Sequence, residues 1–153
     1  MTKTMTKEQA VKSSRIGALA AFGAAGLATV VFLFASFSNV TEGFLSLFND
    51  PTTVLDIGLA VICGFALLRQ SRAAAVTIFA WYLISKVMQL ILYPSTFAGL
   101  GLVISLFFLY FFARAIQGTF NFHRLEKDQN PDYRPSSKWA YILGIPAGLI
   151  GFA

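Results

Sequence analysis

The fold is decided by residues 51–93, PTTVLDIGLAVICGFALLRQSRAAAVTIFAWYLISKVMQLILY, in which two long apolar runs are separated only by RQSR at residues 69–72. Each run is close to the roughly 20 apolar residues that a helix needs to cross a bilayer. Inside lipid the backbone must satisfy its own hydrogen bonds, and the alternating pattern of a β-barrel is absent. Both runs are therefore predicted to be helices, and their short connection makes them an antiparallel hairpin.

Two further apolar runs flank this hairpin, at residues 16–37 before it and at residues 97–116 after it. The chain is 56% hydrophobic and 12% charged, whereas soluble domains have roughly 25% charged residues. We predict an all-α integral membrane protein with a four-transmembrane-helix bundle at residues 16–116.

Eleven of the twelve Lys and Arg residues lie on one side of the apolar runs, and the exception, Lys86, lies inside the third run. The loops at residues 38–53 and 94–96 contain no Lys or Arg. Short loops that are rich in Lys and Arg stay in the cytoplasm, and such residues also attract the anionic leaflet of the membrane. The pattern predicts a polytopic membrane protein whose N-terminus is cytoplasmic and whose residues 38–50 are outside. The small size of the chain and the lack of eukaryotic targeting signals favour the bacterial inner membrane.

Three segments complete the predicted domain organisation. Residues 1–15 form a basic cytoplasmic tail, and residues 117–138 form a cytoplasmic linker. In that linker the fourth helix continues to about Asp128, before the helix-breaking pair at residues 130–131. Residues 139–153 are apolar but too short for a core about 30 Å thick. They are therefore predicted to form a half-span.

Two ionisable residues, Asp56 and Lys86, lie inside the apolar runs of the hairpin at equal sequence separations from Ser71. Such groups cost about 2.5–3.5 kcal/mol each at the centre of a membrane helix, which makes them candidates for function. An antiparallel hairpin places them at the same depth. Helical spacing adds further polar residues to this group, and we name the whole set the polar seam: Asp56, Tyr82, Lys86, Gln89 and Tyr93.

Three interpretations of the polar seam remain open. Asp56 and Lys86 can neutralise each other and lock the hairpin, with Gln89 as a hydrogen-bonding partner between helices. The seam can instead handle protons, an ion or a small polar solute. In the third interpretation the Lys86 ammonium extends outward to the membrane surface without a partner.

The remaining reactive residues indicate neither an enzyme nor a cofactor site. Cys63 is the only cysteine, so disulfide frameworks and thiolate metal sites are excluded, and it is expected to be a small buried apolar residue. His123 is the only histidine and is expected at the membrane surface; pairing it with Glu126 in catalysis is a weaker alternative. No phosphate loop or hydrolase motif occurs, and dispersed basic residues argue against nucleic-acid binding.

These patterns favour a non-enzymatic membrane protein that acts by association, as a scaffold, accessory subunit or assembly factor. Its expected partners are the lipid bilayer and either another membrane protein or further copies of the chain, with residues 119–138 as a docking surface. The alternative is a small oligomeric transporter or channel protomer that uses Asp56, Lys86 and Gln89. Small residues at four-residue spacing, Gly17, Ala21 and Ala25, predict close helix packing.

Overall fold

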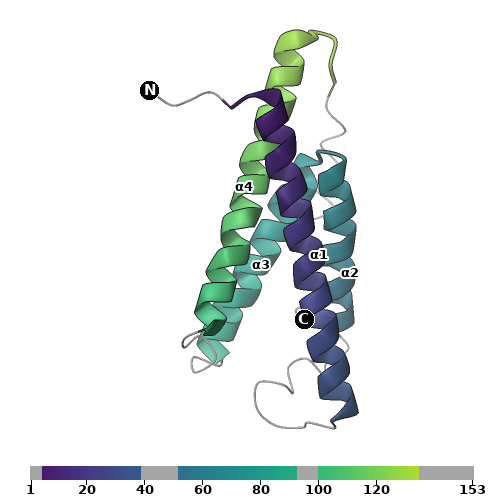
Figure 1. Cartoon of the computed structure of the whole chain (residues 1–153), viewed down its shortest axis with the longest axis vertical. Coiled ribbons are helices and arrows are strands. Elements are labelled where there is room, and N and C mark those ends of the chain that lie inside the picture. The colour runs from purple at the N-terminus through teal and green to yellow at the C-terminus, as the bar shows by residue number, and fades with distance from the viewer. Residues whose placement is uncertain (1–4, 39–51, 93–99, 135–153) are drawn as a thin grey trace.

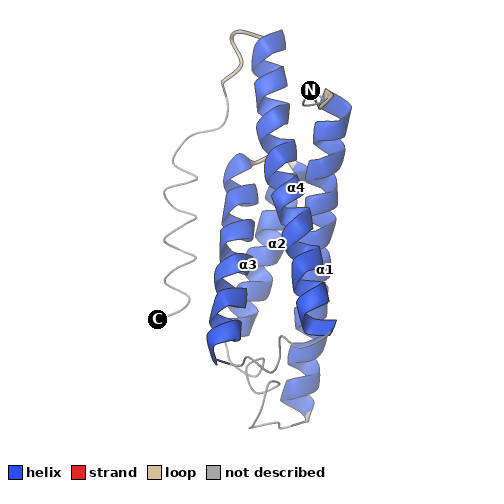
Figure 2. Ribbon diagram, turned by 90° about the vertical axis from the view of Figure 1, so that its left-hand side faces the viewer, coloured by secondary structure: helices blue, strands red, loops and turns tan. Residues whose placement is uncertain are grey.

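The computed structural model describes residues 5–38, 52–92 and 100–134. Within these ranges the chain forms four helices and no strand (Figures 1 and 2): α1 (Lys7–Phe37), α2 (Thr52–Leu68), α3 (Arg72–Leu92) and α4 (Leu100–Gln129). The predicted half-span at residues 139–153, most of the predicted outer loop and Tyr93 lie outside the described residues.

Three of these helices, α1, α3 and α4, are long and apolar enough to cross a membrane, and α2 is a shorter apolar helix of 17 residues. Large apolar side chains are exposed along all four helices, such as Leu19 (68% exposed), Ile62 (68%) and Ile91 (67%). Exposed apolar surface on this scale is unusual for a water-soluble monomer and suits a lipid environment.

Close packing of small residues joins α1 to α4. Gly17, Ala21 and Ala25 are buried, which agrees with the prediction from their spacing. A Cβ atom added to Gly118 would lie 2.7 Å from the carbonyl oxygen of Ala10. The two backbones can approach this closely only because Gly118 has no side chain.

The helix pairs close at one end and separate at the other. In Figure 1, α1 and α2 diverge from α3 and α4 toward the lower end, while all four helices meet at the level of the α2–α3 turn. There the hydroxyl of Ser14 in α1 donates to the carbonyl of Leu67 in α2 at 2.8 Å. The predicted antiparallel hairpin is present: α2 ends at Leu68 and α3 begins at Arg72.

Two helix ends can be compared with the sequence predictions. The end of α4 at Gln129 confirms the predicted extension and its stop before residues 130–131. By contrast, α1 begins at Lys7, inside the segment that we assigned to a basic tail. A capping box starts it: the Gln9 amide N–H donates to the Thr6 hydroxyl at 3.3 Å, and the Thr6 amide donates to the Gln9 side chain at 3.1 Å.

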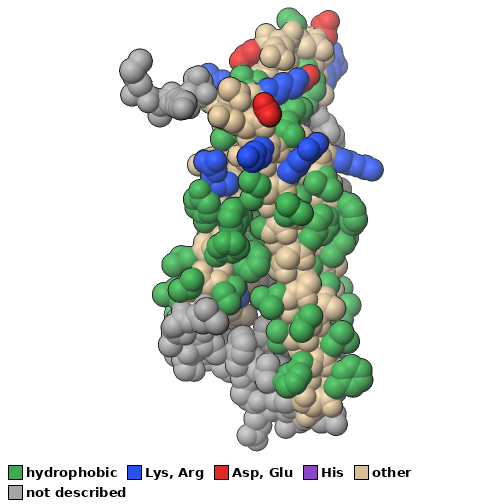
Figure 3. Space-filling view, in the orientation of Figure 1, with side chains coloured by type: hydrophobic (Ala, Val, Ile, Leu, Met, Phe, Trp, Pro, Cys, Tyr) green, Lys and Arg blue, Asp and Glu red, His purple; other side chains and the backbone are tan. Residues whose placement is uncertain are grey.

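Basic residues gather where the start of α1, the α2–α3 turn and the end of α4 meet. Figure 3 shows them as a band across the upper part of the molecule, with apolar surface below. We call this region the basic end; its described members are Lys7, Lys12, Arg15, Arg69, Arg72, Arg114, Arg124, Lys127 and Arg134.

Candidate functional site

A polar cavity of about 130 Å³ lies between the helix pairs, in the part of the bundle where they separate. All four helices line it. The wall from α1 consists of small residues, and Phe112 of α4 closes one side. The polar lining comes from α2 and α3: Asp56, Trp81, Tyr82, Ser85, Lys86 and Gln89. The molecule is hollowed between α1 and the α3–α4 pair in the lower half of Figure 3.

The polar stripe of α3 is fixed by contacts along one helix face. The Lys86 ammonium donates to Oε1 of Gln89 at 2.8 Å, one turn further along α3. The same nitrogen lies 5.1 Å from the centre of the Tyr82 ring, within the range of a cation–π interaction. Tyr82 in turn packs edge-on against Phe112, with ring centres 5.3 Å apart. The ammonium is therefore held at the cavity wall by neighbours on both sides.

Asp56 lines the same cavity from α2. The hairpin thus brings Asp56, Lys86, Gln89 and Tyr82 around one space, as their positions about Ser71 suggest. A direct ion pair between Asp56 and Lys86 stays a prediction. Tyr93, the last member of the polar seam, falls outside the described residues.

The polar cavity has room for small polar species. Its volume of about 130 Å³ is several times what a single water molecule needs. A carboxylate, an ammonium and an amide around such a space can hold water, a proton or a small ion.

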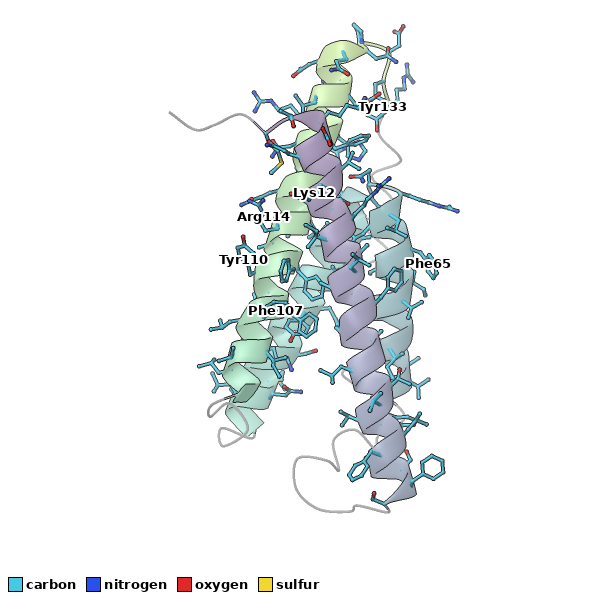
Figure 4. The ribbon with its side chains drawn as sticks, viewed as in Figure 1. Lys12, Phe65, Phe107, Tyr110, Arg114 and Tyr133 are labelled. Atoms are coloured by element: carbon cyan, nitrogen blue, oxygen red, sulfur yellow. The ribbon has the colours of Figure 1, made fainter. Side chains whose placement is uncertain are left out.

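His123 differs from its predicted setting, because it is buried rather than exposed at a surface. Its Nε2 lies 2.7 Å from the carbonyl oxygen of Gln70, in the α2–α3 turn. The Tyr133 hydroxyl lies 2.7 Å from Nδ1, and Figure 4 places Tyr133 beside the upper end of α4. A carbonyl can only accept, so Nε2 carries the proton and Nδ1 accepts from Tyr133. His123 therefore joins α4 to the α2–α3 turn.

The charge state of His123 follows from these surroundings. Burial lowers the pKa of the imidazole below its ordinary value, and Arg72 lowers it further, while the Gln70 carbonyl and Glu126 oppose the shift. Glu126 forms an ion pair with Lys7. The two residues that we considered as a catalytic pair are thus both engaged in contacts between elements.

The turn that His123 contacts has one unusual backbone angle, which only the structure shows. Gln70 has a positive φ of 59°, which is uncommon outside glycine and marks a tight turn. The contact with His123 depends on tertiary packing between residues far apart in the chain, so helical spacing could not reveal it.

Other reactive groups add no second site in the part of the chain that the structure describes. Cys63 is a buried free thiol, as predicted. Among residues 5–38, 52–92 and 100–134, no group of three His, Cys, Asp or Glu side chains is placed to hold a metal ion.

No protein-family model, curated protein or solved structure matches this chain.

Proposed function

We propose that the protein is a protomer of a small oligomeric transporter or channel in the bacterial inner membrane, and that it moves protons or small inorganic ions through the polar cavity. The observation that carries this proposal is the convergence of Asp56, Lys86 and Gln89 on one cavity within the apolar part of the bundle. Ionisable groups at such a position are expensive and usually serve a pathway.

The orientation in this proposal places the basic end in the cytoplasm. Its support is the concentration of Lys and Arg at one end of the helices together with their absence from the loops at residues 38–53 and 94–96. The end of the bundle where the helix pairs separate then faces the outer half of the bilayer. Because four helices rarely enclose a complete pathway, the proposal includes assembly of several copies.

Flux measurements in proteoliposomes test this function. Vesicles that contain the pH-sensitive dye pyranine are given an inside-negative potential with valinomycin and a potassium gradient. We expect faster acidification with the protein than in empty vesicles. If protons are not carried, a voltage-sensitive dye in sodium or chloride gradients reports small-ion conductance.

A matched control is Thr29→Val, because the Thr29 hydroxyl only bonds its own helix, to the carbonyl of Ala25 at 2.8 Å. This variant removes a polar group from α1 outside the cavity lining and should keep the flux. Flux equal to that of empty vesicles for both protons and ions would refute the proposed function.

A second candidate function, association with a partner protein, is favoured by the shape of the basic end. The upper parts of α1 and α4 project beyond the α2–α3 turn in Figure 1. Lys7 and Glu126 tie these two helices together, and His123 ties α4 to the turn. This rigid, charged projection suits a docking surface. Native mass spectrometry after extraction in a mild detergent tests this second function. A partner chain at fixed stoichiometry would support it, and complexes that contain only copies of the protein would contradict it.

A further inference from the structure

A second cavity, of about 380 Å³, lies at the basic end and is separate from the polar cavity. It is lined by residues of α1 and its N-terminal approach together with one residue of α4: Met5, Gln9, Lys12, Ser13, Ile16 and Arg114. Its volume is more than ten times the ~30 Å³ share of one water molecule. The cavity is therefore large enough for a polar group of several heavy atoms.

Two cations from different helices converge on this cavity. Lys12 and Arg114 are both exposed, and neither forms an ion pair within the described ranges. Other basic residues nearby are engaged, because Lys7 pairs with Glu126 and Arg72 lies over the ring of Phe120 at 5.5 Å. The cavity thus holds two positive charges without a carboxylate in its lining, although Glu8 lies one turn before Lys12 on α1.

The depth of the cavity matches the boundary between polar and apolar surface. Gly17 packs directly on Ala115, so Arg114 lies level with the start of the apolar run of α1. Below it on the same face of α4 come Tyr110 and Phe107, at helical spacings of four and three residues. Both are more than half exposed, at 58% and 56%. Figure 4 shows Arg114, Tyr110 and Phe107 one below the other along α4.

We propose that this cavity binds the headgroup of an anionic phospholipid. The phosphodiester lies between the Lys12 ammonium and the Arg114 guanidinium, whose planar fork suits two phosphate oxygens. The Gln9 amide and the Ser13 hydroxyl supply further donors. One acyl chain follows Tyr110 and Phe107 into the bilayer. The proposal needs the basic end to lie at a membrane surface, but it is independent of what the polar cavity carries.

Native mass spectrometry of the detergent-solubilised protein, titrated with dioleoyl phosphatidylglycerol, measures this binding. Dioleoyl phosphatidylcholine serves as the neutral lipid and glycerol 3-phosphate as the soluble headgroup. A hydrogen bond to the phosphate at an exposed site contributes about a factor of five in affinity. We therefore expect Lys12→Gln/Arg114→Gln to weaken phosphatidylglycerol binding about thirtyfold. Phosphatidylcholine binding should not change.

Arg15→Gln/Arg124→Gln is the matched control, because it removes two exposed basic residues from the same end outside the cavity. This control should keep wild-type affinity. If the double variant at the cavity does not fold, Lys12→Gln alone, at an exposed helix position, should weaken binding about fivefold.

Equal weakening in the two double variants would overturn the proposal, because it would show general attraction to the basic end rather than a site. Binding of glycerol 3-phosphate as tight as that of the lipid would also overturn it, since the site would then recognise a soluble phosphate. Equal affinity for phosphatidylcholine would contradict recognition of negative charge.

Discussion

Replacing Gly17 with alanine probes the contact between α1 and α4 on which the arrangement of the bundle depends. The added Cβ atom would lie closer than 3.0 Å to the Cβ of Ala115, and the Ala115 Cα and the Phe111 carbonyl oxygen lie only 3.4 and 3.5 Å away. Carbon atoms pack best at about 3.5–4.0 Å. Neither alanine can rotate away, so the two helices must move apart by at least about 0.5 Å.

The size of the effect follows by comparison with Gly26, a position in the same helix where a Cβ would meet nothing within 4 Å. Both substitutions gain about 1 kcal/mol of helix propensity, and this gain cancels in the difference between them. Overpacking of a close contact costs about 1–3 kcal/mol. We expect Gly17→Ala to be less stable than Gly26→Ala by that amount.

Unfolding by SDS in mixed micelles, followed by far-UV circular dichroism, measures both free energies. A swap supplies the decisive control: Gly17→Ala/Ala115→Gly exchanges the two side chains and leaves the summed helix propensity unchanged. The free energy of unfolding of this swap variant should lie within about 1 kcal/mol of the wild-type value. Equal stability of Gly17→Ala and Gly26→Ala, or no recovery in the swap, would show that these helices do not meet at Gly17.

Two further predictions concern buried polar groups. Asp56→Asn and Lys86→Met should each destabilise the protein. The loss should be smaller than the about 3–5 kcal/mol of a fully buried pair, because both residues are half-buried. The double variant should recover most of the loss in SDS unfolding, and strictly additive losses would exclude an Asp56–Lys86 pair. Because the pKa of His123 is lowered in the folded protein, the unfolded chain binds the proton at a higher pH than the folded chain does. The contribution of His123 to the free energy of unfolding should therefore be fully present above about pH 6.5 and fall as the pH drops below that value. Thermal unfolding between pH 8 and pH 5 should show this fall in stability in the wild type and a flatter pH profile in His123→Gln. Tyr133→Phe should lose about 1 kcal/mol of stability at pH 8. Identical pH profiles for the wild type and His123→Gln would contradict the lowered pKa of His123.

Much of the helical layout could be predicted from the sequence, because long apolar runs and short connections leave few alternatives in lipid. The end of α4 was predictable because a proline follows an asparagine there. The start of α1 was missed, although Thr6 and Gln9 have the spacing of a capping box.

The candidate site could be predicted only in part. Spacing along α3 grouped Tyr82, Lys86 and Gln89, and the hairpin placed Asp56 near their depth. The contribution of α1 could not be predicted, since small residues mark an interface without naming the partner helix. The burial of His123 could not be predicted for a related reason: its partner is the main-chain carbonyl of Gln70, and the sequence does not show which carbonyl a distant side chain will reach.

The flux carried by Asp56→Asn/Lys86→Met, normalised to folded protein in the vesicles, tests the central claim most directly. This double variant removes both charges from the polar cavity and is expected to remain folded, so loss of flux cannot be assigned to unfolding. A pathway through the cavity predicts pyranine acidification, or ion conductance, no faster than in empty vesicles, while Thr29→Val retains the wild-type rate. Wild-type flux in the folded double variant would contradict the claim and would leave Asp56 and Lys86 as residues that only hold the hairpin together.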